Sequence, residues 1–432
     1  MWGQDGQKNI VIDFQQRRAL VAHCTRAGTS DFYRDLYGMP PGTPSYDVPT
    51  EEAWRALPFI GKDELLRKPF ARRLFSPLSE VDYLRSTTGT TGKSVLFSPR
   101  TDLRHGEYRL QYHDFKNALL AYTIPAMPHW HEKLQRSLGY APRVVVFDPK
   151  RARASVRLAR SAGVDGMSLF AFHIPLVGKE MEREGMGARI RFIEICGEAC
   201  TRSLYEYMRK TFPNATIIPL YGSTEAEDSP TGVPCRAIDG REPLALYHEK
   251  QSQYHELIEP ETGALIEPRA GAEGELVVSA YAGEPSAFPL IRFRTDDIVR
   301  VVDAHCVEHG TWSFTVLGRT SLDFLRVAGG MLRADEIERV LRQFDQYVSD
   351  RFELHLTEET AGGVPKVRGL LYVDPKHDVD FDALARKIES MLRVGPSFTY
   401  QDGVTRGLYM PLVCGRLANT AEGKKQKRLI RD

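Results

Sequence analysis

The chain has 432 residues, too many for one compact core, so its length predicts two or three domains. Hydrophobic residues make up 42% and charged residues 27%, a composition that argues against disorder. The formal net charge of +1 gives no reason to expect binding to nucleic acid or to an acidic membrane surface. No apolar run is long enough to span a bilayer, and the first residues lack a secretory signal pattern, so we expect a cytoplasmic protein.

The first two thirds of the chain predict a helical start followed by a parallel sheet. Residues 1–80 are expected to be largely helical. Short apolar runs at 143–147, 190–195 and 216–221 then alternate with helical patterns. Such alternation is typical of βαβ units, in which the strands form a mainly parallel sheet covered by helices.

From about residue 255 onward, the pattern of apolar residues changes. Strand patterns at 255–263, 274–278 and 297–302 indicate a β-rich subdomain. After Gly318, a helix beginning near Ala334, a strand and a second helix indicate a small α+β unit. The last two elements are expected at residues 369–373 and 381–392, and residues 419–432 are expected to form a basic, mobile tail.

The expected fold class is therefore α/β with two domains. A large N-terminal domain, residues 1–318, would hold mainly parallel βαβ sheets plus the β-rich subdomain. A small, mobile α+β domain, residues 319–432, would complete the chain.

The most distinctive motif is a loop of small and hydroxylic residues, YLRSTTGTTGKS at 83–94. Small residues let backbone N–H groups approach phosphate oxygens, and Lys93 adds a mobile positive charge. A Walker A loop would need glycine at position 87, where the chain has Thr87, so the loop is not that of a P-loop NTPase. The alternative is an ordinary solvated loop, which the uninterrupted run of small and hydroxylic residues before the lysine argues against.

This loop resembles the phosphate-binding signature of the adenylate-forming superfamily, which includes acyl-CoA synthetases, luciferases and peptide-synthetase adenylation domains. Five further segments resemble the family's motifs and occur in its order. They are residues 196–199, 221–225, 292–297, 318–338 and 420–424. Within the superfamily the chain is most similar to phenylacetate-CoA ligase, notably at 260–263 and 289–295.

The resemblance implies ATP and Mg²⁺ as cofactors and assigns roles to individual residues. Binding of the nucleotide falls to residues in six segments: Thr87, Thr88, Gly89, Thr90, Thr91, Gly92 and Lys93; Gly197, Glu198 and Ala199; Tyr221 and Gly222; Thr224 and Glu225; Asp297; and Arg319. Among these, Thr224 would bond the α-phosphate and Glu225 would ligate Mg²⁺, as suits a hard cation. Tyr221 would stack on adenine, and Asp297 would accept hydrogen bonds from the ribose hydroxyls.

Lys424 is the catalytic lysine that the resemblance implies. A flexible ammonium can reach acyl and phosphate oxygens as negative charge develops on them. The neighbouring Lys425 is the alternative, and the preceding Gly423 favours Lys424. The hinge segment, GRTSLD at 318–323, departs from the family's Gly-Arg-x-Asp-Asp pattern, so the sequence does not identify the hinge residue.

A zinc site is the second implication of the resemblance, because some relatives of phenylacetate-CoA ligase carry one. Six cysteines in a chain of this length predict reduced thiols or metal ligands, and not a disulfide framework. The candidate ligands are Cys235, His248 or His255, Cys306 and His309, a mixed set that suits tetrahedral zinc. The alternative is a set of unlinked cysteines and histidines.

The function expected is ATP-dependent activation of an aryl or arylacetic acid as acyl-AMP, followed by thioester formation with CoA. The aryl pocket would be lined from residues 170–173, Tyr112, Phe115 and Trp130, although such aromatic clusters more often belong to a hydrophobic core. One alternative is an adenylating enzyme that passes the acyl group to a carrier protein or an amine. The other is a nucleotide-binding protein without catalysis. A homodimer is a further expectation.

Overall fold

The computed structural model describes a defined part of the chain. The described residues are 13–75, 85–86, 96–97, 112–114, 117–121, 143–197, 200, 202–222, 231–249, 253–280, 288–307, 309–319, 324–327, 330–395, 398–417 and 429–431. The phosphate loop from Thr87 to Lys93, Glu198, Ala199, Thr224, Glu225 and Lys424 lie outside them.

The N-terminal segment is helical as expected, but its helices are short and separated by turns. They are α1 (Phe14–Cys24), α2 (Asp31–Leu36), α3 (Glu51–Arg55), α4 (Lys62–Leu66) and α5 (Phe70–Arg73). Helix α1 begins with a capping box, in which the Asp13 side chain accepts from the Gln16 backbone and the Gln16 side chain accepts from the Asp13 backbone. A two-stranded pair follows, formed by β1 (Arg85–Ser86) and β2 (Leu96–Phe97).

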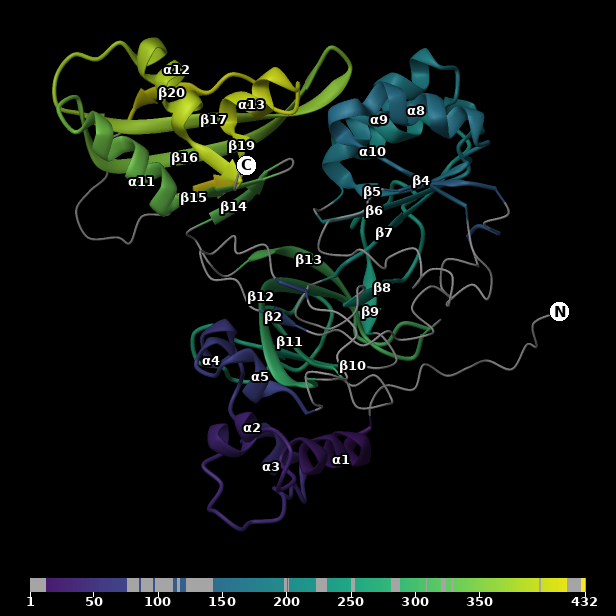
Figure 1. Cartoon of the computed structure of the whole chain (residues 1–432), viewed down its shortest axis with the longest axis vertical. Coiled ribbons are helices and arrows are strands. Elements are labelled where there is room, and N and C mark those ends of the chain that lie inside the picture. The colour runs from purple at the N-terminus through teal and green to yellow at the C-terminus, as the bar shows by residue number, and fades with distance from the viewer. Residues whose placement is uncertain are drawn as a thin grey trace.

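The predicted parallel sheet is confirmed. Its strands are β3 (Leu119–Ala121), β4 (Val144–Val146), β5 (Gly166–Phe170), β6 (Phe192–Cys196) and β7 (Thr216–Pro219), in the order β4-β3-β5-β6-β7. Three helices that connect these strands pack together on it: α8 (Ala152–Ser161), α9 (Ile174–Arg183) and α10 (Arg202–Thr211) (Figure 1). Between helices and sheet lies a core of buried aliphatic and sulfur-containing side chains.

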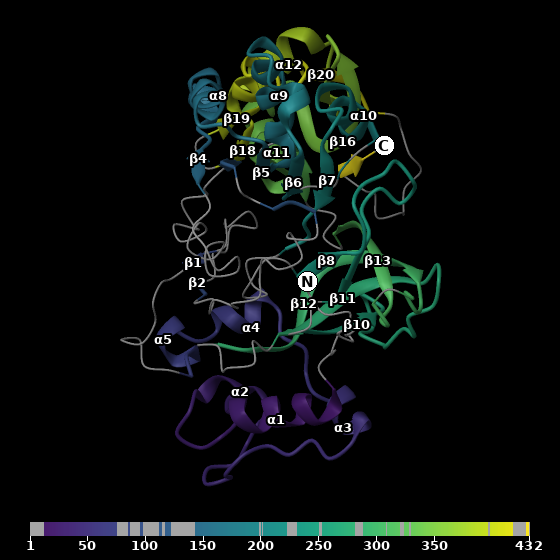
Figure 2. The ribbon, with the colours of Figure 1, turned by 90° about the vertical axis from the view of Figure 1, so that its right-hand side faces the viewer.

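The predicted β-rich subdomain is a six-stranded antiparallel sheet. Its strands are β8 (Gly232–Pro234), β9 (Tyr247–Glu249), β10 (Gln253–Ile258), β11 (Glu273–Ala280), β12 (Leu290–Asp303) and β13 (Ser313–Arg319), in the order β10-β11-β12-β13-β9-β8. Figure 2 shows this sheet between the N-terminal helices and the rest of the chain. A second core, which includes Trp54, Phe293 and Phe314, joins the sheet to those helices.

The C-terminal part forms the expected α+β unit around a third core. Its elements are β14 (Phe324–Val327), β15 (Gly330–Arg333), α11 (Ala334–Leu341), β16 (Val348–Ala361), β17 (Val364–Pro375), α12 (Phe381–Met391), β18 (Arg393–Gly395), β19 (Phe398–Thr399), α13 (Tyr400–Thr405), β20 (Val413–Arg416) and β21 (Leu429–Arg431). The expectation of a mobile tail is wrong for β21, which pairs in parallel with β16 because buried Leu429 lies beside Leu354.

Arg292, the first residue of the motif at 292–297, ties the antiparallel sheet to the N-terminal helices. Its guanidinium is buried, donates to the carbonyl oxygens of Arg55 at 2.7 Å and Leu57 at 2.5 Å, and pairs with Glu256 at 3.1 Å. It also lies 4.1 Å from the ring centroid of Phe59. One charge therefore satisfies carbonyl groups that the helix-to-sheet junction would otherwise leave buried without donors.

Replacing Arg292 by methionine should strongly destabilise the protein. The change leaves the Glu256 carboxylate buried without its partner, which typically costs about 3–5 kcal/mol. The control is Arg300→Met, which removes a half-exposed pair with Glu273 and should cost about 0–1 kcal/mol. Urea unfolding measures both changes, and equal losses would contradict the role assigned to Arg292.

Candidate active site and metal cluster

The segment expected to line the adenine lies at the carboxyl edge of the parallel sheet. Strand β6 ends at Cys196, and Gly197 follows it with φ +84°. A Cβ at position 197 would lie 2.6 Å from Cδ1 of Phe170, the last residue of β5. Glycine is therefore required for two reasons, because the backbone is left-handed and because an aromatic ring fills the space beside it.

Tyr221 and Asp297, which come from motifs 76 residues apart, meet in a buried contact. The Tyr221 hydroxyl donates to Oδ2 of Asp297 at 2.7 Å. Tyr221 follows β7 of the parallel sheet, whereas Asp297 lies on β12 of the antiparallel sheet. The sequence analysis predicts that both residues contact the nucleotide. The structure brings them together at the junction of the two sheets.

A local hydrogen-bond network holds the Asp297 backbone, and it includes Glu275, which the sequence analysis missed. Thr295 donates its hydroxyl to the Leu276 carbonyl and accepts from the Asp297 amide. Glu275, fully buried on β11, pairs with Arg294 and accepts from the amide of Asp296, whose φ is +61°. The lone acid among the apolar residues of the 274–278 strand pattern was the signal for Glu275, because a buried carboxylate needs a charged partner.

Three rings gather at the same edge of the parallel sheet. The His173 ring lies 5.2 Å from the Phe147 centroid and 5.8 Å from that of Phe170. Burial lowers the pKa of His173 to about 3, so its ring is neutral at ordinary pH. Tyr112 instead packs against a small core that includes Phe192. Phe115, Trp130 and the side chain of Phe172 lie outside the described residues.

A second cluster lies at one end of the antiparallel sheet and is built from cysteine and histidine. Cys235 follows β8, His248 lies on β9, and Cys306 lies in the turn between β12 and β13. Their ligand atoms all lie within 4.8 Å of one another, and the sulfurs of Cys235 and Cys306 are 3.9 Å apart. A disulfide bond is about 2.0 Å long. Two thiolates on a tetrahedral zinc ion at about 2.3 Å would be about 3.8 Å apart, as observed here.

His248 fits this cluster and His255 does not. Both ring nitrogens of His248 are buried and have no hydrogen-bond partner among the described residues. Burial, with a smaller contribution from His309, lowers the pKa of His248 to about 3, which leaves its ring neutral, as a metal ligand must be. The His309 ring centroid is 3.7 Å from that of His248. His255 instead uses Nε2 in a 3.0 Å hydrogen bond with Gln253.

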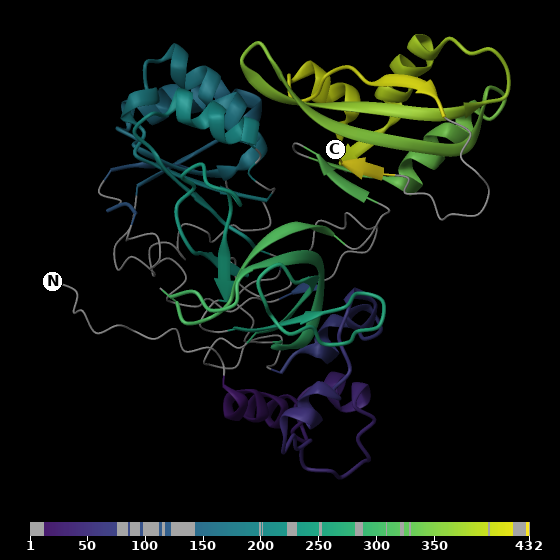
Figure 3. The same cartoon turned by 180° about the vertical axis from the view of Figure 1, so that it is seen from behind.

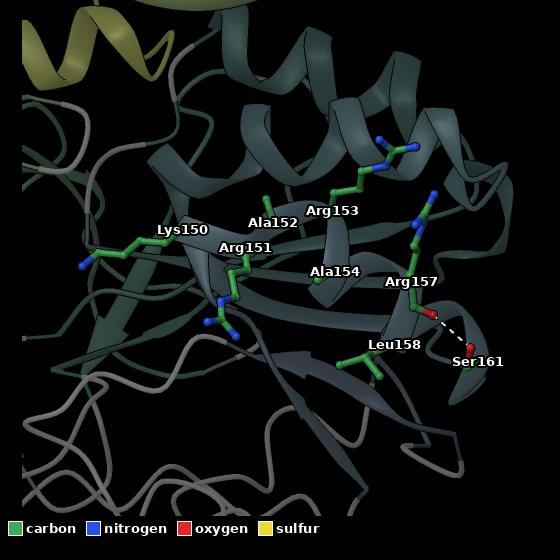
Figure 4. A pocket seen from close by; sticks show the side chains of 8 residues that line it. All are labelled: Lys150, Arg151, Ala152, Arg153, Ala154, Arg157, Leu158 and Ser161. Atoms are coloured by element: carbon green, nitrogen blue, oxygen red, sulfur yellow. Dashed lines mark hydrogen bonds between the residues drawn. The ribbon is translucent and has the colours of Figure 1, made fainter.

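A hollow on the outer surface contains none of these groups. It has a volume of about 690 Å³ and is lined by η2 (Pro149–Arg151) and α8, with Lys150, Arg151, Arg153 and Arg157 supplying its charge (Figure 4). Arg157 already pairs with Glu184.

Within the described residues, no helix is both long and apolar enough to cross a membrane.

Comparison with known proteins gives a consistent picture. No protein-family model matches the chain. The chain is 23% identical to a phenylacetate-coenzyme A ligase of Pseudomonas putida over 330 residues, covering 72% of this chain and 70% of the relative.

Solved structures share the fold over nearly the whole chain. A 2-hydroxyisobutyryl-CoA ligase in complex with its acyl-AMP and CoA, in the thioesterification state, is similar with a TM-score of 0.66 and 15% identity, covering 98% of this chain and 91% of that one. A nonribosomal peptide synthetase protein with adenylation and carrier domains is similar with a TM-score of 0.50 and 18% identity, covering 90% of this chain and 64% of that one. The ordered motifs, the curated relative and this shared fold all fit the adenylate-forming superfamily.

Proposed function

We propose that the protein activates a carboxylic acid with ATP as acyl-AMP, releases pyrophosphate, and then transfers the acyl group to the thiol of CoA. The contact between Tyr221 and Asp297 supports this proposal most directly, since it brings the expected adenine and ribose residues together. The curated relative is itself a CoA ligase.

The chemistry explains why these residue types are needed. Adenylation joins two anions, a carboxylate and a triphosphate, so the site must screen charge and align the carboxylate with the α-phosphorus. The threonine-rich loop and Lys93 would hold the outer phosphates, Glu225 would hold Mg²⁺, and Thr224 would bond the α-phosphate. The Tyr221 hydroxyl uses one position on the Asp297 carboxylate, and the remaining acceptor positions suffice for two ribose hydroxyls.

An aryl or arylacetic acid is the substrate class that we propose. Phe170 is only partly buried and lies beside Gly197, at the edge where the acyl-AMP would form, and the buried His173 ring packs next to it with Phe147 beyond. Aromatic rings pack well against one another in edge-on arrangements, and that of Phe147 and His173 is of this type. Transfer to a carrier protein or an amine is the second candidate, supported by the fold shared with an adenylation and carrier protein.

We also propose that the observed arrangement of the C-terminal unit, residues 319–432, is the one that serves acyl transfer. The 2-hydroxyisobutyryl-CoA ligase matches this chain with a TM-score of 0.66 in its thioesterification state, but only 0.54 in its open conformation. The resemblance to the superfamily implies a different orientation for adenylation, in which Lys424 reaches the reacting carboxylate.

A structural zinc ion held by Cys235, His248, Cys306 and His309 completes the proposal. The sulfur separation and the unpartnered nitrogens of buried His248 both fit such an ion. It would fasten β8, β9 and the turn between β12 and β13, and so stabilise the sheet that carries Asp297.

Acid-dependent cleavage of ATP should yield AMP and pyrophosphate. A panel of carboxylic acids that includes benzoate and phenylacetate, supplied with ATP and Mg²⁺, tests this by pyrophosphate release. Adding CoA should then give an acyl-CoA, whereas an acyl-AMP that turns over only with a carrier protein would favour the second candidate. ADP as the acid-dependent product would contradict the adenylation proposal.

Substituting Lys424 by alanine should abolish adenylation while leaving ATP binding nearly intact. Loss of one preorganised contact to developing charge typically lowers the rate by about 10²–10³-fold. Transfer from supplied acyl-AMP should suffer much less. The matched control is Lys425→Ala, which should be nearly silent because the resemblance to the superfamily assigns that lysine no role. Damage from Lys425→Ala alone would show that the assignment of the lysine is wrong by one residue.

Purified protein should contain about one equivalent of zinc per chain. His248→Gln and Cys306→Ser should lose the metal, whereas His255→Gln should retain it because that ring bonds Gln253. Cys414→Ser, a buried cysteine in the C-terminal core, is the control for loss of any thiol. Metal analysis with thermal unfolding measures the outcome, and metal-free protein of unchanged stability would contradict the site.

A further inference from the structure

The hairpin formed by β16 and β17 extends well beyond the sheet to which it belongs. The two strands pair along almost their whole length, from Val348 opposite Pro375 to Ala361 opposite Val364. Strand β21 pairs with β16 only at residues 354–356, and β20 pairs with β17 only at 370–373. Residues 357–366 therefore project as a two-stranded arm, which Figures 1 and 3 show reaching toward the helices of the parallel sheet.

The arm is built to be stiff. Its two-residue turn is Gly362-Gly363, with φ of +63° and +77°, as a type I′ turn requires. Such a turn matches the natural twist of paired strands. At the base of the arm, Arg368 on β17 makes a bidentate pair with Glu359 on β16 at 2.5 and 2.9 Å. A stiff arm can hold two parts of a protein in a fixed relation, which a flexible loop cannot.

The tip of the arm contacts the large domain. Both β16 and β17 contact α10, and Val364 packs against the core cluster formed around α8, α9 and α10. The carboxylate of Glu358 is near enough to Cys200 to contribute, after burial, to the raised pKa of that thiol, which is about 12. Cys200 lies three residues after Gly197. The arm therefore docks beside the segment that is expected to line the adenine.

We propose that Val364 is a positioning residue, through which the arm holds the C-terminal unit in the orientation for acyl transfer. This inference rests on the function proposed above. A contact made in only one orientation shifts the equilibrium by its own free energy, and an apolar side chain in an apolar interface supplies that difference. The arm thereby sets how much of the acyl-AMP-bound enzyme stands ready for CoA.

Val364→Lys tests the proposal, because a charge cannot be buried cheaply against the apolar core. The matched control is Thr360→Lys, which puts the same charge on an exposed residue of the same arm. Each half-reaction is measured on the full-length protein. Pyrophosphate exchange with ATP and the acid reports adenylation, and single-turnover acyl-CoA formation from supplied acyl-AMP and CoA reports transfer.

A direct measure of the contact accompanies the kinetics. Hydrogen–deuterium exchange of the backbone amides is followed in α10 and in the arm, for both variants and the unsubstituted protein. Release of the arm should raise exchange in residues 202–211 and leave the rest of the parallel-sheet region unchanged, which separates undocking from unfolding.

We expect Val364→Lys to slow acyl transfer by about tenfold or more, to leave pyrophosphate exchange unchanged or faster, and to raise exchange in α10. Thr360→Lys should leave all three unchanged. Equal loss of both half-reactions, or undocking of the arm with unchanged acyl transfer, would overturn the proposal. If the unsubstituted protein instead shows no pyrophosphate exchange with any acid, the proposed function itself fails, although amide exchange still reports whether the arm docks.

Discussion

The hydrogen bond from Tyr221 to Asp297 is the contact on which the arrangement of the site depends. Tyr221 follows the last strand of the parallel sheet, but its ring packs in the core of the antiparallel sheet that carries Asp297. A carboxylate as buried as Asp297 needs donors, and the phenol and the Thr295-anchored backbone both keep it in place. Because the acceptor oxygens are fixed before any nucleotide arrives, binding would not have to order them.

The rest of the antiparallel sheet supports this one acid from two directions. At one side, Glu275 holds Arg294 and the strained backbone of Asp296, so the carboxylate at 297 points to a defined place. At the other, the cysteines and His248 gather where β8, β9 and the turn before β13 converge. The carboxylate proposed to bind the ribose is thus held by several bonds within its own sheet, as precise positioning of reacting groups demands.

Prediction from the sequence succeeded where the signal was local or ordered along the chain. The apolar runs at 143–147 and 216–221 form parallel strands, because β-branched residues favour the extended backbone of a buried strand. The choice between His248 and His255 was not accessible in this way. His248 lies on β9 and His255 on β10, which follow one another along the chain but do not pair, and only the folded sheet decides which ring faces Cys306.

The long hairpin was missed for a related reason. Its sequence, with Glu, Thr, Lys and Arg at many positions, alternates weakly, and only 369–373 gave a strand signal. An arm that leaves its sheet has solvent on both faces over part of its length, so neither face must be apolar, and the period of two fades. The apolar residue that anchors it, Val364, packs against a core that includes residues of α10, more than 150 residues away along the chain. Contacts between domains are therefore the features that are hardest to predict from a sequence, because few residues make them and no local pattern indicates them.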